Sequence, residues 1–311
     1  MTKGDAMKAE IGGTPDAVAV EPAETSGREG TGPGPDSQRQ PGGRRARRLL
    51  GVWIGLAMLV VLFTSALAAR LWADTDAVDV DAVLQGPSAD HWFGTDENGR
   101  DVFVRTLAAG AADLPIALGG TVIALVAGTL LGLLAGTRNR YAEPIMRVVD
   151  GFQAFPLLIL ILVIVQISGG GMAVLAGTIA IINMPRFIRL TRAEALHIRE
   201  SRFVFFAEVI GASRRHVLRR HVLPNVSGAV LSQASLGGAL ALGAIGAMSF
   251  LGLGIAPPTP SWGAMVQSGT AGITSGQWWP VLFPSLALVW AIVAFNLIAD
   301  SLDAHFAKEI Q

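Results

Sequence analysis

Residues 49–69 read LLGVWIGLAMLVVLFTSALAA, a run that contains no charged side chain. About 20 consecutive apolar residues are enough for an α-helix to cross the hydrocarbon core of a bilayer. The basic residues Arg44, Arg45, Arg47 and Arg48 come directly before this run. Because Lys and Arg favour the cytoplasmic side of a membrane, the stretch predicts a transmembrane helix that begins in the cytoplasm.

Five further apolar stretches predict five more transmembrane helices: 115–137, 151–167, 172–185, 226–253 and 281–299. Asn183 and Pro185 interrupt the fourth span, and a five-span chain is the main alternative. The composition agrees with a membrane protein, since 51% of residues are hydrophobic, 15% are charged and the mean hydropathy is +0.49. Soluble domains carry about 25% charged residues. We therefore expect an all-α, polytopic membrane protein with six spans.

The distribution of charge orients these spans, although the formal net charge is zero. With six spans and both termini in the cytoplasm, 21 of the 24 Lys and Arg residues lie inside, and only Arg70, Arg100 and Arg105 lie outside. The loop 74–101 then faces outward and is rich in Asp, as outer loops tolerate. A five-span chain would place the Arg-rich stretch 186–220 or one terminus on the wrong side.

The chain ends lie outside this apolar region. Residues 1–43 are rich in Gly, Pro, Glu and Ser and nearly free of large apolar side chains. Such a segment cannot bury enough surface to offset its ordering entropy, so we expect a disordered cytoplasmic tail rather than a signal peptide. The expected transmembrane domain is 44–306, and 307–311 form a short cytoplasmic C-terminus.

The sequence offers little for catalysis or cofactor binding. It has no Cys, its five His residues lie outside the spans, and it contains no phosphate-binding loop of the Gly-x-x-x-x-Gly-Lys-Ser/Thr type. Asp150 and Asp300 lie near span ends, where a carboxylate reaches water or a basic neighbour such as Arg147. We therefore expect no enzyme, no metal and no cofactor in this chain. Few charges lie within the spans, which weakens the alternative of an ion-coupled carrier.

Glycines within two spans indicate close helix packing. Gly128, Gly132 and Gly136 follow one another at four-residue spacing, which lets two helices approach closely. Span five contains Gly237, Gly238, Gly243 and Gly246. Those four residues suit either a packing face or the wall of a water-filled path.

The loop between spans four and five, with its core at 196–224, carries the clearest functional signal. Phe203, Phe206 and Ile210 form one helical stripe, and Gly211 suits the left-handed position that ends a helix. Ser213 is placed to cap a second short helix, and Pro224 is expected to end it. An exposed apolar stripe needs a cover. A soluble partner protein or the membrane surface itself would supply one.

Two outer segments contain tight polar turns and tryptophans. Asp96 or Asp101 is placed to cap the helix that leads into span two, and Arg100 to pair with either carboxylate. Contact with a substrate is the alternative role for these residues. Ser261 is expected to begin a short helix that bears Trp262, and Trp278 and Trp279 precede span six. We expect these tryptophans to anchor the membrane interface. A pore mouth or a contact with a binding protein is the alternative.

Four motifs in order resemble one family. Gly211 and, after nine residues, His221-Val-Leu-Pro224 resemble the coupling loop of ABC-importer permeases. The stretches 91–101 (HWFGTDENGRD), 146–150 (MRVVD) with Pro156, and 249–263 (SFLGLGIAPPTPSWG) resemble the C-type permease of dipeptide, oligopeptide and nickel importers. The resemblance covers about residues 45–306. At the family's leading Glu-Ala position this chain has Phe205-Phe206, and only Ala207 fits.

The resemblance implies an ABC type I importer permease fold in the bacterial inner (plasma) membrane. It implies four protein partners: a homologous second permease, two ABC ATPase subunits that hold ATP and Mg²⁺, and an external solute-binding protein. The expected cargo is a dipeptide or oligopeptide. The alternatives are a nickel chelate, or peptide export by the same fold. No nucleic-acid partner is expected.

The resemblance also implies two sets of site residues. The expected ATPase-coupling residues are Phe203, Phe206, Ala207, Glu208, Ile210, Gly211, Ala212, Ser213, His221, Leu223 and Pro224. The expected structural motif of the outer loop consists of Gly94, Thr95, Asp96, Gly99, Arg100 and Asp101.

Overall fold

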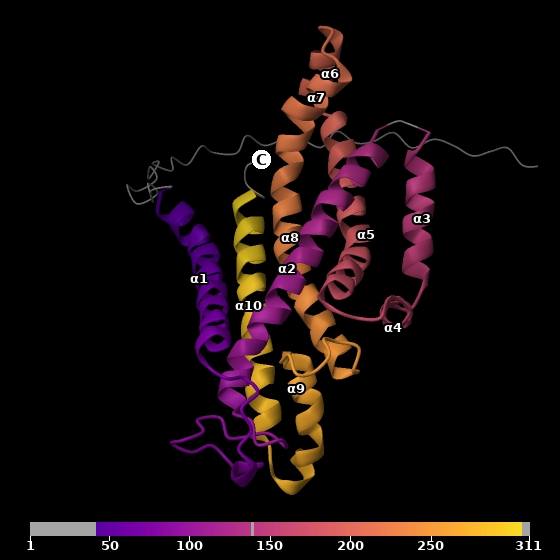
Figure 1. Ribbon diagram of the computed structural model, residues 1–311. Coiled ribbons are helices and arrows are strands. Elements are labelled where there is room, and N and C mark those ends of the chain that lie inside the picture. The colour runs from indigo at the N-terminus through magenta and orange to yellow at the C-terminus, as the bar shows by residue number, and fades with distance from the viewer. Residues whose placement is uncertain (1–41, 138–139, 307–311) are drawn as a thin grey trace, which may run out of the picture. The chain divides into compact units, whose positions relative to one another are not determined.

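A computed structural model describes the backbone of residues 42–137 and 140–306 (Figure 1). It describes side chains from residue 50 onward within these ranges, except those of residues 203, 205, 208, 214 and 215. The expected tail thus lies outside the described residues, apart from its last two. The described residues form helices and loops and no strand, which confirms the all-α prediction.

The helices follow one another along the chain with the following bounds: α1 Gly42–Trp72, the 3₁₀ turn η2 Val80–Ala82, α2 Val102–Ala135, α3 Ala142–Ala154, α4 Leu157–Ser168, α5 Met172–Arg199, α6 Arg202–Val209, α7 Arg214–Val217, the π-helical turn η3 Leu218–Val222, α8 Leu223–Phe250, α9 Trp262–Gly269, the 3₁₀ turn η4 Thr270–Ser275 and α10 Trp279–Phe306.

Five of these helical segments are long and apolar enough to cross a membrane: α1, α2, α5, α8 with its preceding turn, and α10. The pair α3 and α4 passes the same test together but is bent by 94°. The expected count of six spans agrees with the structure if this bent pair is one span. Pro156 explains the break, since it lies between the two helices and has no N–H to continue the ladder.

Helix α2 begins well before the expected start at Pro115. Asp101 caps it, accepting a hydrogen bond from the backbone N–H of Val104 at 3.1 Å. Pro115 lies inside the helix, where the expectation had placed the beginning of a span. The capping signal at Asp101 therefore marks the helix start, and the proline does not.

Two more prolines fail to end helices. Helix α5 runs through Pro185 to Arg199, so the Arg-rich stretch after the expected fourth span is largely helical. Pro224 does not end the second short helix, because the chain passes through η3 into α8 with Pro224 in the first turn. Both expectations were wrong at these ends. In the first turn of a helix the missing proline N–H costs no interior hydrogen bond.

Glycines bring α2 and α5 together, as the four-residue spacing predicted. A Cβ placed on Gly128 would lie 2.5 Å from the Cβ of Phe187, and one on Gly132 would lie 2.6 Å from that of Thr191. At Gly136 it would lie 2.8 Å from the Cβ of Ala195. A larger side chain at any of these positions would push α5 away.

The glycines of α8 divide between packing and open space. A Cβ on Gly238 would lie 2.6 Å from the Phe295 ring, and one on Gly246 would lie 2.8 Å from Leu288. Both partners belong to α10. Gly243 has nothing within 4 Å of the added atom. Of the two alternatives, a packing face and the wall of a water-filled path, the packing face therefore holds at Gly238 and Gly246.

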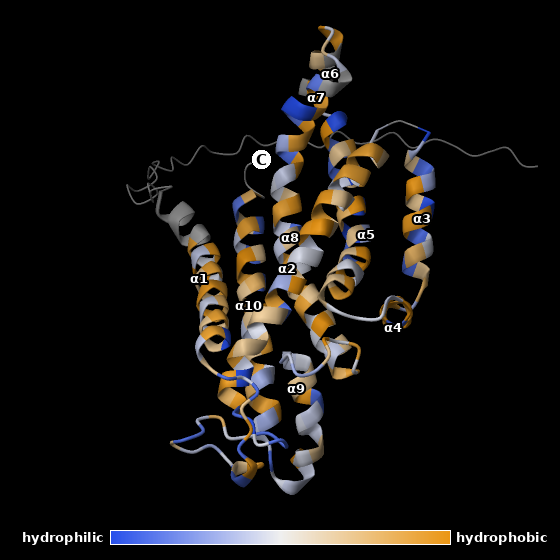
Figure 2. Ribbon diagram, viewed as in Figure 1, coloured by the Kyte–Doolittle hydropathy of each residue, from blue (hydrophilic) through white to orange (hydrophobic). Residues whose placement is uncertain are grey.

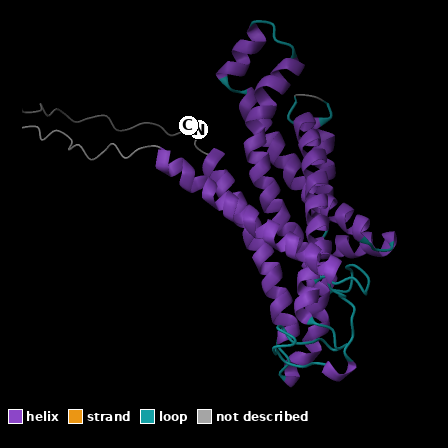
Figure 3. Cartoon of the chain, turned by 60° about the vertical axis from the view of Figure 1, so that its left-hand side comes forward, coloured by secondary structure: helices purple, strands orange, loops and turns teal. Residues whose placement is uncertain are grey.

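The described part has two distinct ends (Figures 2 and 3). Helices α6 and α7 project at one end, and at the other the polar loop 74–101 and the segment 252–278 gather around α9 (Figure 1). Between them the helices expose many large apolar side chains, such as Trp53, Val61 and Ile159. Such a band is expected where helices face lipid.

Candidate functional site

The hairpin of α6 and α7 contains most of the predicted coupling residues. Gly211, at φ +89°, makes the bend between the two helices. The N–H of Ala212 donates to the carbonyl of Ala207 at 3.0 Å, which closes the end of α6. Ser213 Oγ accepts the N–H of His216 at 3.3 Å and caps α7. The predicted left-handed glycine and the predicted cap are both present.

One side of the hairpin is anchored in the bundle. Val204 and Val217 are each 1% exposed. They belong to a buried cluster with Phe187 and Ile198 of α5 and with Val226 of α8. Ala207 and Ala212 pack against this cluster as well. Of the predicted coupling residues, these two alanines therefore face inward, toward α5 and α8.

The other side of the hairpin is apolar and open. Phe206 is 62% exposed, Val209 is 65% and Ile210 is 83%. Phe203 and Glu208, the remaining predicted residues of α6, have side chains outside the described set. The sequence pattern did not point to Val209, although a helix position adjacent to Ile210 widens the same apolar face. The covering of this face by a partner stays a prediction.

The last three predicted coupling residues lie after the hairpin. His221 is partly exposed in η3, and Leu223 and Pro224 are exposed in the first turn of α8. The carbonyl of His221 accepts a hydrogen bond from the Asn225 side chain at 2.6 Å. These residues therefore form the junction between the hairpin and a long helix of the bundle.

At the opposite end, the outer-loop motif folds on itself. Asp96 Oδ1 accepts the N–H groups of Asn98 at 2.8 Å and Arg100 at 2.9 Å. Gly94 and Gly99 both have φ +72°. Thr95 is fully buried, and its hydroxyl accepts the N–H of Gln85 at 2.9 Å and donates to the carbonyl of Ala82.

The expected ion pairs of Arg100 are wrong. Among the described residues, Asp101 pairs with His91 at 2.9 Å, and Asp96 lies 3.9 Å from Arg105. Arg105 was not predicted as a site residue, yet its side chain is only 9% exposed. It binds Asp76 at 3.0 Å, the carbonyl of Thr75 at 2.8 Å and that of Pro258 at 3.4 Å. It thereby joins the loop 74–101 to the segment after α8.

Asp113 is a second functional candidate that was not predicted from the sequence. This side chain is 1% exposed within α2. Its Oδ2 accepts the N–H of Trp262 at 2.9 Å and the hydroxyl of Ser261 at 3.3 Å, and Ser261 also bonds to Ser249 at 3.0 Å. A lone Asp in the apolar run before Pro115 was the available signal, but the expected span began after it.

Two of the tryptophans are not interface anchors. Ser261 begins α9 as predicted, but Trp262 is fully buried and its Nε1 donates to the carbonyl of Thr106 at 2.8 Å. Trp279 is 8% exposed and donates to the carbonyl of Thr95 at 3.0 Å. Their indole N–H groups find partners inside the fold, so both rings are structural. Only Trp278 of the three is half exposed.

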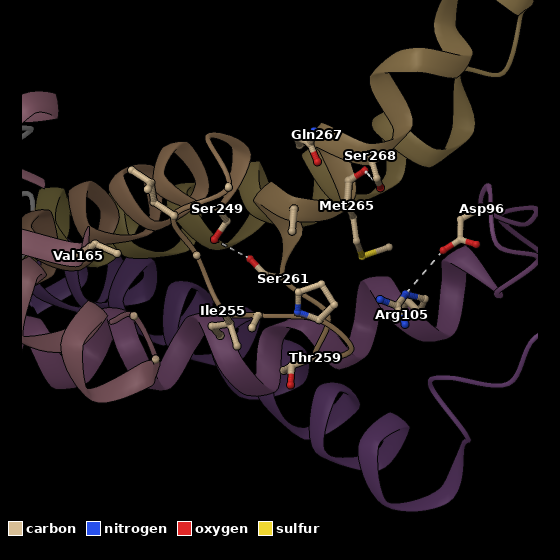
Figure 4. A pocket seen from close by; sticks show the side chains of 18 of the residues that line it. Asp96, Arg105, Val165, Ser249, Ile255, Thr259, Ser261, Met265, Gln267 and Ser268 are labelled. Atoms are coloured by element: carbon tan, nitrogen blue, oxygen red, sulfur yellow. Dashed lines mark hydrogen bonds and ion pairs between the residues drawn. The ribbon is translucent and has the colours of Figure 1, made fainter. Parts of the chain in front are cut away.

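A cavity of about 670 Å³ lies at this end, between the turn 96–100, the glycine turn 169–171 and the segment 252–268 (Figure 4). The charged lining residues come from the outer loop and the start of α2. Ser249 and Ser261, which belong to the hydrogen-bond network of Asp113, also line the cavity. Chemically this cavity offers polar recognition rather than a catalytic set. Among the described residues, no three His, Asp or Glu side chains are arranged to hold a metal ion.

The two acids near span ends, Asp150 and Asp300, are exposed, and Asp150 pairs with a different arginine from the one that the sequence suggested. Asp150 is 62% exposed at its side chain and pairs with Arg189 at 2.6 Å. Arg147, the neighbour suggested by the sequence, pairs with Glu143 at 2.6 Å instead. Asp300 is exposed. Neither acid forms part of a buried pair.

With five or six helical segments that are long and apolar enough to cross a membrane, the chain has the architecture of a multi-pass membrane protein. Residues 128–311 match the family described as binding-protein-dependent transport system inner membrane component. The chain belongs to this family, and it is a permease subunit of an ABC importer.

Relatives with known names cover most of the chain. It is 36% identical to the dipeptide transport system permease protein DppC of Alkalihalophilus pseudofirmus, over 79% of this chain and 80% of the relative. It is 37% identical to the probable D,D-dipeptide transport system permease protein DdpC of Escherichia coli, over 81% and 83%. It is 35% identical to the glutathione transport system permease protein GsiD of Pectobacterium atrosepticum, over 83% and 87%.

Proposed function

We propose that this chain forms half of the pore of an ATP-driven importer that takes dipeptides or oligopeptides into a bacterial cell. The relatives reported above are named as dipeptide or glutathione transport permeases, and these names support a peptide cargo. A second, homologous permease would supply the other half of the pore. Two ATPase subunits would bind ATP and Mg²⁺, and an external binding protein would deliver the cargo.

The observation that carries this proposal is the two-sided α6–α7 hairpin. Its exposed apolar side, with Phe206 and Ile210, suits the cleft of an ATPase subunit. Its buried side, with Val204 and Val217, contacts α5 and α8. A movement of the ATPase subunit would then be transmitted through this short, fixed bend to α5 and α8. The chain itself would break no bond.

This function requires the hairpin to face the cytoplasm and the cavity end to face outward. The 21-to-3 division of basic residues supports that orientation. The termini would then both lie in the cytoplasm, and the protein would lie in the plasma membrane. An amphipathic hairpin lying on lipid is the alternative for the α6–α7 end.

The test is uptake of a labelled dipeptide by cells with and without this chain. We expect uptake to require the chain, its ATPase partners and the binding protein. Uptake into proteoliposomes that contain this chain without ATPase subunits would instead indicate an ion-coupled carrier. Loss of nickel accumulation with normal peptide uptake would indicate a nickel-chelate importer. Faster loss of preloaded peptide from cells that contain the chain would indicate export.

A further inference from the structure

The cavity at the α9 end contains charged side chains that no residue in the described part of the chain neutralises. Arg105 is engaged, because its guanidinium binds Asp76 and two backbone carbonyls and lies near Asp96. The side chain of Arg100 makes no hydrogen bond or ion pair with any residue that the structure describes. Its Nε is buried without an acceptor. Arg100 also repels Arg105 electrostatically.

Arg100 lines the cavity, and a guanidinium without a partner among the described residues favours an acceptor that enters there. Two arginines on one cavity, of which only one is neutralised, favour an anion as the missing partner. Carboxylates fit guanidinium groups well, because the planar fork can donate two parallel hydrogen bonds. The cavity therefore has the chemistry of a carboxylate site.

A second feature of the same wall favours an anion. The glycine turn 169–171 leads into α5, and all three residues have positive φ. Gly171 is the N-cap residue and offers no side chain to accept the first N–H groups of the helix. An added Cβ at any of the three glycines would meet nothing within 4 Å, so the backbone is open to a ligand. A helix N-terminus with free N–H groups attracts negative charge.

The cavity also offers the opposite charge. Glu97 is exposed, and its side chain has no hydrogen bond or ion pair within the described part of the chain. An inorganic anion would be repelled by this carboxylate. A molecule with one ammonium and one carboxylate group would satisfy both Glu97 and Arg100. The volume of about 670 Å³ lies within the range of about 300–1,000 Å³ that is typical of small-molecule sites.

We propose that this cavity is a receiving site for the free termini of a short peptide. Arg100 and the glycine turn 169–171 before α5 bind the C-terminal carboxylate, and Glu97 binds the ammonium group. The proposal rests on the proposed function, because it takes the imported peptide as the ligand. It adds a site on the permease itself, where the peptide binds during its passage from the binding protein to the pore.

A thiol-protection experiment on the purified transporter complex tests the site without the binding protein. The chain has no native Cys, so Gln267→Cys places a single exposed thiol on the cavity wall. Asp90→Cys places a matched exposed thiol at the same end but outside the cavity. The probes are alanyl-alanine and alanyl-alanine amide, which lacks the carboxylate. The rate of labelling by a thiol reagent is measured for each.

We expect alanyl-alanine to slow labelling at position 267 and not at position 90, and the amide to protect neither. Arg100→Gln should raise the half-protecting concentration by about tenfold or more, as expected when a charged hydrogen bond is lost. Arg100→Lys should restore part of the protection. Arg70→Gln, which removes an exposed arginine outside the cavity, should leave protection unchanged.

Equal protection by the amide, undiminished protection in Arg100→Gln, or no protection by saturating alanyl-alanine would each overturn the site. Cellular uptake separates this result from the proposed function. If cells import labelled alanyl-alanine through this chain but the thiol is unprotected, the site is wrong and the function stands. If the thiol is protected but the chain supports no uptake, the site stands as a peptide site and the proposed function is wrong.

Discussion

The two ends of this permease differ in how far their large side chains are buried within the chain. At the α9 end, Asp113, Trp262 and Trp279 are buried, and hydrogen bonds join them to residues far away in the sequence. At the α6–α7 end, a short hairpin has one buried side and leaves Phe206 and Ile210 exposed. Buried side chains that find their partners far along the chain, as these three do, have a structural role. A region that leaves apolar surface open, at a fixed bend, is suited to contact another protein.

The comparison requires the two ends to lie on opposite sides of the membrane, and testing this should give the largest effect. Asp79→Cys and Ser213→Cys place exposed thiols at the cavity end and at the hairpin. In whole cells we expect an impermeant thiol reagent to label position 79 fully and position 213 not at all, since basic loops stay inside. Labelling at 213 with none at 79 would invert the orientation. Permeabilised cells should label at both positions, which controls for accessibility.

The next largest effect is expected at Gly211. Gly211→Val forces a β-branched residue into a left-handed conformation, at a cost of about 1–2 kcal/mol or more. The bend would shift, and stimulation of ATP hydrolysis by loaded binding protein should fall by about tenfold or more, because about 1.4 kcal/mol corresponds to tenfold. Insertion into the membrane should be normal. The assay is ATP hydrolysis by the reconstituted complex.

Gly276 supplies the matched control, because it has φ +87° and equally open space but lies at the α9 end. Gly276→Val should leave the stimulation near normal. If Gly211→Val is fully stimulated, the hairpin is not the coupling element. In that case replacing Arg214, Arg215, Arg219 and Arg220 should matter more, as expected for a hairpin held on lipid headgroups.

The two sides of the hairpin should respond differently to the same change. Val204→Asp buries a carboxylate without a partner and should lower the free energy of unfolding by about 3 kcal/mol or more. Ile210→Asp changes an exposed position and should alter it by about 0.5 kcal/mol or less. Yet Ile210→Asp should prevent co-purification of the ATPase subunits. A large loss of stability in Ile210→Asp, measured by thermal unfolding in detergent, would contradict the two-sided hairpin.

Asp113 tests the other half of the comparison. Asp113→Ala leaves the N–H of Trp262 and the hydroxyl of Ser261 without this acceptor, at a cost of about 1–3 kcal/mol. Asp113→Asn keeps an oxygen acceptor and should cost less. Because Met265 of α9 is 7% exposed, labelling of Met265→Cys should speed up in Asp113→Ala. Unchanged labelling would show that α9 is held in place without this carboxylate.

The smallest effect is expected from deletion of residues 1–43. Their composition gives them little apolar surface to pack against either end. Transport by the shortened chain should equal that of the full chain, when both are compared at equal amounts in the membrane. Loss of transport with normal insertion would contradict this expectation and give the tail a role.

Local sequence signals predicted much of the α6–α7 end. The stripe Phe206 and Ile210, the left-handed Gly211 and the cap at Ser213 depend on neighbours within a few residues, so periodicity and capping rules find them. The four-residue glycine spacing likewise predicted the α2–α5 contact, because it only requires small side chains on one helix face. Prolines misled the prediction because Pro115 and Pro185 lie inside membrane-spanning helices, which tolerate proline, whereas Pro224 lies in a first turn.

The α9 end shows what the sequence by itself could not determine. Apolar runs, charge asymmetry and motifs were enough to predict a helical membrane permease, because these properties are local or additive along the chain. The partners of Asp113, Arg105 and Trp262 lie up to 156 residues away in sequence. Only the tertiary fold brings such groups together, and the burial of a polar side chain depends on these long-range contacts. The same long-range folding forms the cavity and leaves Arg100 without a partner in the described chain.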